Sequence, residues 1–460
     1  MKPEGVGEPG VGEKLGRYPL LDALRDRRSR RFGMGMKIES GPFAYESHHE
    51  PLPLTETEEA ALAFAACGVT GYALADLSYG RGQGGGMLAG LLGRAVASPD
   101  AINTVSVFVT NDEAAYLLKR PQDFAPDEIP TLVELARRGE LVEPYRKGRI
   151  KIADGRAAPP VEPGYNFNIN RWALYAPGST YFLPVQEMTA IYVNALLEAF
   201  DEEMALFVVD ERASFRPAGI SRFAQSKGGH LNNDTSSGRM ATIQAIEASL
   251  AEACAIEQGM VLQNLALMSQ ALGLGGYPNF ARHEFGWFQA LGFRMGEMPA
   301  SQYLGANRLI STALRLLGRD QPVPYPLGLE RGGEILLKPY CPPYYPSMEA
   351  AVHEFVERKF GPQGVFRGGA SASGWREPDE KAAAIPAPSE AAIEATIAYC
   401  EYVYEGYGRF PAYSAPFRTV LGHQATHVDV DFYDRFYHPD ALSEAQRQHT
   451  DRWHDLEAQT

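Results

Sequence analysis

Residues 242–274 carry the sequence pattern that most constrains how this chain folds. Apolar residues recur there at every third or fourth position, the spacing that lines one face of a helix. The run ends in Gly273-Leu274-Gly275-Gly276, which puts glycine where helices commonly end. Since little charge lies beyond Glu257, the second half is expected to be buried on most sides. The pattern predicts one long helix, carried by Ile243, Ile246, Leu250, Ala253, Ile256, Met260, Val261, Leu265, Met268 and Leu272.

The rest of the chain mixes helical and strand patterns. Thr55–Cys67 opens with Thr55 and Glu58 in the spacing of a capping box, which predicts a helix start. β-branched residues alternate in Asn103–Thr110 and predict a strand. A closing strand is expected at Gly333–Lys338. Helical patches are predicted at Ala114–Leu118 and Val185–Ala199.

Composition excludes several functional classes. The chain has 460 residues and a net charge of −14, so nucleic acid and anionic membrane surfaces are not expected as main partners. No stretch is long and apolar enough to span a bilayer, and the first residues lack the apolar core of a signal peptide. The four cysteines lie far apart without a Cys-x-x-Cys pair, so a reduced, cytoplasmic protein is expected.

A dense run of arginines follows the first predicted helix. Arg25, Arg27, Arg28, Arg30 and Arg31 lie within seven positions, with Ser29 among them. Like charges this close repel one another unless an anion or carboxylates neutralise them. Two interpretations stay open: a phosphate site that uses charge-assisted hydrogen bonds, or a solvated basic turn balanced by nearby aspartates.

Three segments in order resemble the FMN-dependent nitroreductase superfamily. The first is the Arg-Arg-Ser-x-Arg of Arg27–Arg31, which Phe32 follows. The second is the Ser-Pro-x-x-x-Asn of Ser98–Asn103, which leads into the predicted strand. Glu257–Gly276 is similar to the family's long central helix, with its Gln-Asn and Gly-Leu-Gly features. Leu52–Gly71 further resembles the branch that oxidises azolines to thiazoles and oxazoles.

The resemblance implies an α+β fold in which helices flank a central, mainly antiparallel sheet. It also implies an intertwined homodimer with two FMN sites at its interface. On this likeness Arg27, Arg28 and Ser29 hold the phosphate and ribityl chain of FMN, and Arg31 lies near the pyrimidine edge. Ser98 and Asn103 lie beside the flavin, and the backbone at Gly276 and Tyr277 approaches N5. Lys338 matches the basic residue near the end of the family's domain.

Three regions are expected along the chain. Residues 1–16 form a flexible arm, and residues 17–345 form the FMN-binding domain with a large insertion at about 112–240. Residues 346–460 form a linker and a helical extension rich in histidine and aromatic residues.

The function expected from the resemblance is two-electron or hydride transfer between flavin N5 and a small organic substrate. Two versions stay open: reduction of a nitro or quinone-like acceptor driven by NAD(P)H, and dehydrogenation of a dedicated substrate. The alternative is a flavin-binding or flavin-independent scaffold or partner protein that keeps a nitroreductase-like core. No residue is assigned as catalytic acid or base.

A metal-dependent enzyme is a third interpretation of the histidine-rich tail. His427, Asp429 and Asp431 alternate, so on a strand they would share one face and offer ligands to a divalent cation. On a helix, His423 and His427 would share a face instead. A tail that covers the active site or a partner subunit is the favoured expectation, and no residue is assigned as a metal ligand.

Overall fold

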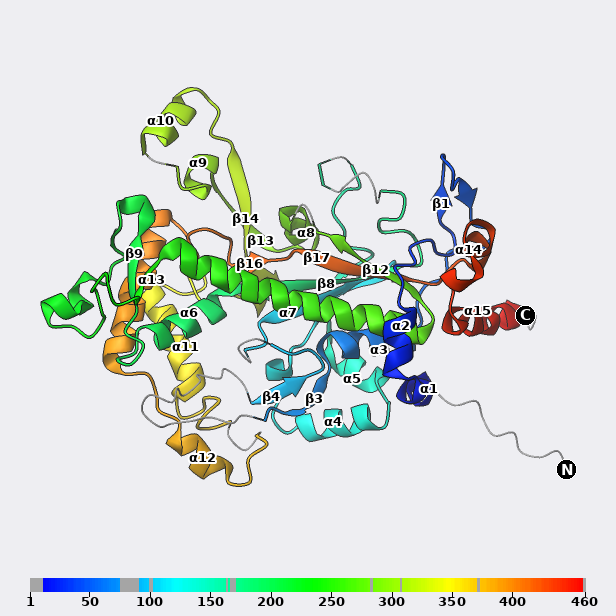
Figure 1. The fold of residues 1–460 in the computed structure, drawn as a ribbon, viewed down its shortest axis with the longest axis horizontal. Coiled ribbons are helices and arrows are strands. Elements are labelled where there is room, and N and C mark those ends of the chain that lie inside the picture. Colours follow the sequence, from blue (N-terminus) through cyan, green and yellow to red (C-terminus); the bar gives the residue numbers. More distant parts are fainter. Residues whose placement is uncertain are drawn as a thin grey trace.

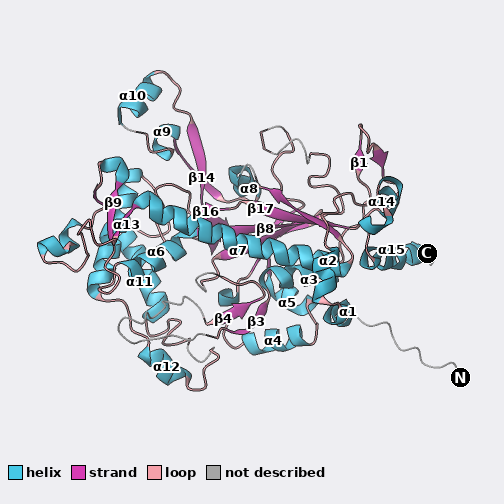
Figure 2. Ribbon diagram, viewed as in Figure 1, coloured by secondary structure: helices cyan, strands magenta, loops and turns pink. Residues whose placement is uncertain are grey.

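The computed structural model describes residues 11–74, 91–98, 102–162, 164–165, 171–281, 284–306, 308–369 and 373–457. Within them, helices and mainly antiparallel sheets form a mixed α+β architecture, as the resemblance implies (Figures 1 and 2). Residues 1–10 of the predicted arm and residues 99–101 of the second motif lie outside the described residues. The last residues of the arm lie in helix α1 (Val11–Arg17).

In the part of the chain that the structure describes, the central sheet contains seven strands. They are β5 (Val105–Thr110), β6 (Ala114–Leu118), β7 (Arg149–Asp154), β8 (Thr180–Glu187), β12 (Gly275–Phe280), β16 (Phe417–Arg418) and β17 (Leu421–Thr426). Six of them follow the order β12-β17-β8-β5-β6-β7, and β16 pairs with the end of β8. All of these pairings are antiparallel.

Helix α7 (Ile243–Leu272) runs across one face of this sheet (Figure 1). Its 30 residues cover the segment for which the sequence predicts a single helix. The Thr242 side chain caps its start by accepting from the amide of Ala245, and Gly273 ends it with a φ of 80°. Helix α3 (Glu56–Cys67) packs beside α7 and begins with the predicted capping box of Thr55 and Glu58.

Strand β5 shows how the sheet is buried on both faces. Val107 and Val109 pack toward α3 and α7, while Phe108 packs on the opposite face with Trp287 of helix α8 (Glu284–Ala290). Successive residues of a strand point to opposite faces, so the three consecutive apolar residues of β5 fill two cores.

The other strands form smaller sheets. They are β1 (Lys37–Ile38) with β2 (Tyr45–Glu46), β3 (Val69–Tyr72) with β4 (Leu92–Arg94), β9 (Phe207–Asp210) with β10 (Arg216–Pro217) and β11 (Met240–Thr242), and β13 (Arg294–Pro299) with β14 (Pro322–Arg331) and β15 (Glu334–Leu337). The closing strand expected at Gly333–Lys338 corresponds to β15.

The remaining helices surround these sheets. They are α2 (Leu20–Asp26), α4 (Ile129–Arg137), α5 (Val142–Gly148), α6 (Met188–Ala199), α9 (Ala300–Tyr303), α10 (Arg308–Leu316), α11 (Met348–Phe360), α12 (Pro378–Ala384), α13 (Glu390–Tyr407), α14 (Val430–Phe436) and α15 (Glu444–Glu457). Helices α6, α11 and α13 pack together around a second apolar core. Among the described residues, no helix combines the length and the apolar character needed to cross a membrane.

Two of the predicted helical patches are wrong in whole or in part. Ala114–Leu118 forms strand β6, because it pairs with β5 on one side and β7 on the other. Val185–Ala199 divides at Glu187, where β8 ends and the Glu187 carboxylate caps α6 by accepting from the amides of Thr189 and Ala190.

The predicted regions share one sheet. Strand β8 comes from residues 112–240, which the sequence predicts to be an insertion. Strand β17 comes from residues 346–460, predicted to be an extension, and lies between β12 and β8. The boundary placed at 345–346 therefore divides strands that are hydrogen-bonded in the central sheet.

Replacing Gly273 by alanine is expected to lower the free energy of unfolding by about 1–2 kcal/mol or more, because a left-handed backbone disfavours any Cβ. A Cβ there would also lie 2.3 Å from the Ala445 carbonyl oxygen and 2.7 Å from the His449 Cβ. A Cβ at Gly259, in the middle of α7, would have nothing within 4 Å. Gly259→Ala is therefore the matched control, expected to stabilise by about 0.5–1 kcal/mol. Equal effects in chemical unfolding would contradict this account.

Candidate functional site

The arginine run lines a cavity of about 500 Å³, here called the arginine cavity. Arg28, Ser29 and Arg31 contribute to its wall, together with aromatic residues from three other parts of the chain. Asp440 lines the same cavity, so the charged side chains in its wall are mainly positive. The volume lies within the range of roughly 300–1,000 Å³ that small-molecule sites occupy. The aromatic lining residues are Phe32, Phe43, Trp172, Phe432, Tyr433 and Tyr437.

Arg30 holds the run in place. Its side chain is only 3% exposed, and it donates to the Gln270 side chain on α7 at 2.7 Å and to the Ala441 carbonyl at 2.8 Å. Burial lowers the pKa of Arg30 from its usual value. This buried anchor fixes the segment after α2, so that its neighbours Arg28 and Ser29 remain exposed at the cavity.

Stacked rings form one side of the arginine cavity. Phe32 stacks on Phe432 of α14 with ring centroids 4.1 Å apart, and Trp172 stacks on Phe32 at 6.0 Å. The Arg31 guanidinium lies 5.7 Å from the Trp172 ring centroid and 5.8 Å from that of Tyr277. Arg31 and Tyr277, which the resemblance assigns to one site, are therefore neighbours.

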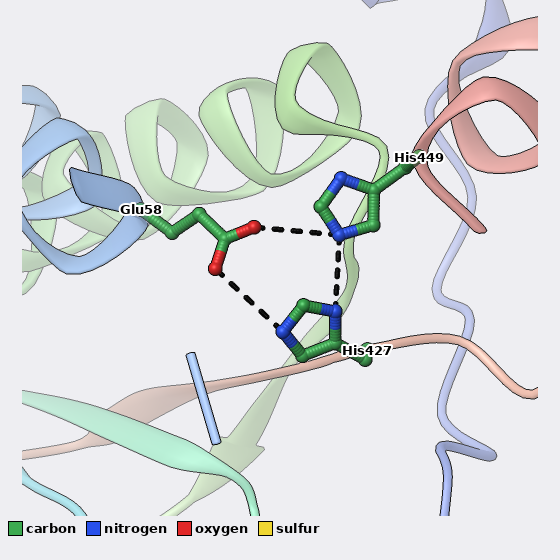
Figure 3. A group of neighbouring side chains, drawn as sticks. All are labelled: Glu58, His427 and His449. Atoms are coloured by element: carbon green, nitrogen blue, oxygen red, sulfur yellow. Dashed lines mark hydrogen bonds and ion pairs between the residues drawn. The ribbon is translucent and has the colours of Figure 1, made fainter. Parts of the chain in front are cut away.

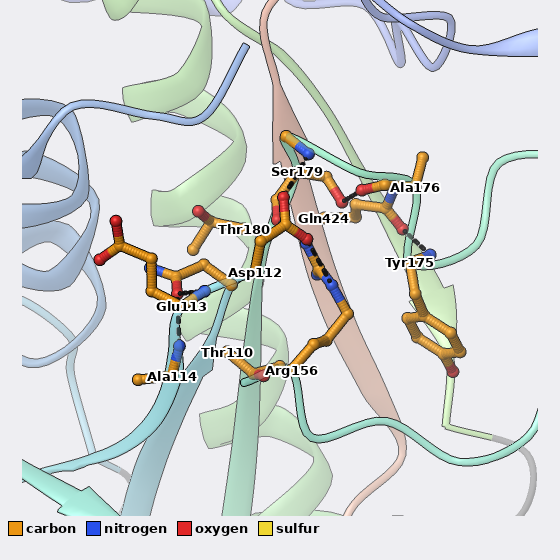
Figure 4. A network of polar contacts seen from close by, with 12 residues as sticks. Thr110, Asp112, Glu113, Ala114, Arg156, Tyr175, Ala176, Ser179, Thr180 and Gln424 are labelled. Atoms are coloured by element: carbon orange, nitrogen blue, oxygen red, sulfur yellow. Dashed lines mark hydrogen bonds and ion pairs between the residues drawn. The ribbon is translucent and has the colours of Figure 1, made fainter. Parts of the chain in front are cut away.

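The segment that carries Trp172 is tied to the central sheet (Figure 4). Gln424 of β17 donates to the Ala173 carbonyl at 2.7 Å and accepts from the Tyr175 amide at 3.4 Å. Asp112 accepts from the Gly178 amide and pairs with Arg156, each at 2.6 Å. These bonds hold the wall of the arginine cavity in one position.

Gly276 lies in β12, one residue before Tyr277, and its backbone pairs with Ala425 of β17. A Cβ at Gly276 would lie 2.6 Å from the His423 Nε2 and 2.9 Å from the Ser269 hydroxyl oxygen. The Ser269 hydroxyl oxygen and the His423 Nε2 lie 2.9 Å apart in a buried contact. This contact leaves no room for a Cβ, so the position requires glycine.

Ser98, Asn103 and Lys338 lie at the other end of the sheet. The Ser98 hydroxyl bonds to the Glu257 carboxylate at 3.2 Å and accepts from the Asn103 amide at 3.3 Å. Asn103 precedes β5, whose first residue pairs with Gln186 near the end of β8, whereas the arginine cavity lies near the start of β8. Because a strand rises about 3.3 Å per residue, Asn103 and the arginine cavity are roughly 20 Å apart along β8.

Asn103 and Lys338 line a second cavity of about 490 Å³, here called the cationic cavity. Four positively charged side chains line this cavity, against two carboxylates. The Lys338 ammonium lies 4.5 Å from the centroid of the Tyr345 ring. The charged lining residues are Arg120, Lys338, Arg358, Lys359, Asp123 and Glu187. Arg27 contributes to neither of these two cavities.

The histidine-rich tail is arranged differently from both predictions. Strand β17 ends at Thr426, so His427, Asp429 and Asp431 do not lie on one strand face, and His423 and His427 do not share a helix. His427 turns toward Glu58 and His449, whereas Asp429 and Asp431 group with His49. Tail residues Tyr437 and Ala441 line the arginine cavity, which matches a tail folded over a site.

His423 makes the stability of the folded protein depend on pH. Complete burial lowers its pKa from 6.5 to about 3, whereas in the unfolded chain the imidazole gains a proton near pH 6.5. Its contribution to stability is therefore present above pH 6.5 and is lost as the pH falls below it. We expect a loss of about 2 kcal/mol between pH 7 and pH 5, measured by chemical unfolding. His423→Gln should remove this part of the loss, and the exposed His438→Gln should not.

Sequence reasoning missed Trp172 and Arg30. Trp172 lies more than a hundred residues from the arginine run, and no local pattern connects them. Arg30 belongs to the run, but spacing alone does not separate a buried anchor from its exposed neighbours. The sequence feature that points to Tyr437 is the aromatic-rich C-terminal extension, which is expected to cover the active site or a partner subunit.

No protein-family model matches the chain, and no curated protein matches its sequence. Among solved structures, the chain matches a protein from Ralstonia eutropha that is described as a proposed nitroreductase. The identity is 13% and the TM-score 0.28, with 64% of this chain and 80% of that chain covered.

Proposed function

We propose that the protein is an FMN-dependent oxidoreductase whose arginine cavity holds the phosphate of the cofactor. The observation that carries this proposal is the meeting of Arg28, Ser29 and Arg31 in one cavity with aromatic walls. Guanidinium and hydroxyl groups form charge-assisted hydrogen bonds with a phosphate, and flat aromatic walls suit a planar ring system. The acidic chain thus keeps a local positive site for an anionic cofactor.

The residues around this cavity have separate roles in the proposal. Arg28 and Ser29 bind the phosphate, and Arg31, beside Trp172 and Tyr277, stabilises negative charge on a bound ring. When bound, FMN supplies two-electron transfer to or from a small organic substrate. Both NAD(P)H-driven reduction and dehydrogenation of a dedicated substrate fit these residues.

Ser98, Asn103 and Lys338 enter the proposal through a second copy of the chain. A homodimer would bring the cationic cavity of one copy toward the arginine cavity of the other. Helix α10, on the projecting β13–β14 arm, exposes Leu309, Ile310 and Leu316, which supports an apolar contact there (Figure 1). Sedimentation of the purified protein tests the dimer.

The visible absorption spectrum of the purified protein tests the cofactor. We expect a yellow protein that releases one equivalent of FMN on denaturation. A colourless protein that also fails to bind added FMN would exclude the oxidoreductase and favour the scaffold. Bound FMN that no candidate substrate or NAD(P)H reduces or oxidises would favour a flavin-binding partner protein.

A further inference from the structure

Glu58, His427 and His449 meet in a buried cluster outside both cavities (Figure 3). We propose that these three side chains bind a transition-metal ion of the zinc class. They come from the first turn of α3, the residue after β17, and α15, so the cluster joins segments almost 400 residues apart. Their exposed fractions are 3%, 1% and 6%.

The donor atoms suit such an ion. Two imidazoles and one carboxylate form a ligand set that proteins use for zinc, at bond lengths of about 2.0–2.2 Å. In a tetrahedral site these bonds put ligand atoms about 3.3 Å apart. The His449 Nε2 lies 3.3 Å from a Glu58 carboxylate oxygen and 3.0 Å from the His427 Nδ1. The three side chains therefore need only small movements to surround an ion.

The two oxygens of Glu58 have different surroundings. Oε2 accepts from the Thr55 amide at 2.7 Å and from the Thr55 hydroxyl at 2.8 Å, which is the capping box of α3. Oε1 is the oxygen nearer His449. The helix cap thus orients the carboxylate as an outer partner orients a metal ligand, with Oε1 toward His449 and Oε2 3.6 Å from the His427 Nε2.

The arrangement of the two rings and the carboxylate also favours a metal. The rings of His427 and His449 lie nearly parallel, with centroids 5.0 Å apart, and the carboxylate lies across from both (Figure 3). A cation here would balance the negative charge of the buried carboxylate.

The proposed site has a structural role. Helix α15 lies directly on the end of α7, because a Cβ at Gly273 would meet Ala445 and His449. An ion bound by Glu58, His427 and His449 would fasten α15 and the end of β17 to α3. Ligand binding that occurs only in the folded state adds to stability.

Metal analysis of the full-length protein, followed by titration of the chelator-treated protein with Zn²⁺, tests the site. We expect one equivalent of bound metal and a melting temperature that falls on chelation and returns with Zn²⁺. His449→Ala and Glu58→Gln should each weaken Zn²⁺ binding roughly a hundredfold or more, beyond the loss typical of an outer partner. The exposed His438→Ala is the control and should bind as the unchanged protein does.

Three outcomes would overturn the proposal. The unchanged, folded protein could take up no Zn²⁺ at micromolar concentration, which would leave a hydrogen-bonded Glu–His–His cluster sharing a proton. The two ligand variants could bind Zn²⁺ as well as the control. Zn²⁺ binding could instead disappear in His49→Ala, which would place the ion beside Asp429 and Asp431. These measurements do not depend on FMN, so the metal site and the flavin proposal can fail separately.

Discussion

Replacing Arg28 by alanine is expected to weaken FMN binding by about tenfold to 150-fold. Arg28 lines the arginine cavity, and a hydrogen bond to a charged group contributes about 1.5–3 kcal/mol. The loss should appear as release of FMN during dialysis and as a higher dissociation constant in fluorescence titration of the flavin-free protein. Ser29→Ala should weaken binding less, because the hydroxyl offers one hydrogen bond to the phosphate and no positive charge.

Arg25→Ala is the matched control for the loss of one positive charge. Arg25 belongs to the same arginine run, but its exposed side chain pairs with Asp22 and Asp26 and does not line the cavity. Its removal should leave FMN affinity within about twofold, as expected for an exposed ion pair. If Arg25→Ala and Arg28→Ala lose FMN equally, general charge and not the cavity holds the cofactor.

Replacing Glu257 by glutamine is expected to lower the free energy of unfolding by about 3–5 kcal/mol. Glu257 of α7 forms a fully buried ion pair with Arg94 of β4, and removal of one partner leaves the other charge buried and uncompensated. Arg94 also donates to the Val105 carbonyl at 3.1 Å, so the pair links α7, β4 and the first residue of β5. The midpoint of chemical unfolding measures the change.

The exposed pair between Arg146 and Glu56 provides the comparison. Arg146→Ala should cost about 0–1 kcal/mol, because solvent screens the pair. A similar loss in both variants would show that the burial of Glu257 is not what makes its pair important. The Ser98 hydroxyl also bonds to Glu257. The Glu257→Gln variant therefore also tests whether Ser98 depends on this carboxylate for its position.

Local signals predicted the helices better than the sheet. The capping box at Thr55 and the apolar period of residues 242–274 act within one helix, so the sequence alone specified α3 and α7. Ala114–Leu118 contains alanine and leucine, which favour helices, but it forms β6 because two neighbouring strands pair with it. Pairing of that kind depends on distant residues and leaves no local pattern.

The sequence predicted the local part of the candidate site and not the distant residues that complete it. The arginine run is a local feature, and three of its members do line a cavity. The partner Trp172 comes from a distant segment held by Gln424 and Asp112, and no spacing in the sequence reveals that contact. The alternation of His427 with Asp429 suggested one strand face, yet β17 ends before either residue, so the two side chains join different groups.

The position of β17 has a consequence for biosynthesis. Residues 421–426 fill the place between β12 and β8, so the ribosome must reach residue 426 before the central sheet can close. Until then β8 and β12 each present an unpaired edge, and such edges attract other chains. A nascent or truncated chain that lacks β17 would thus be prone to aggregation and a natural client for chaperones.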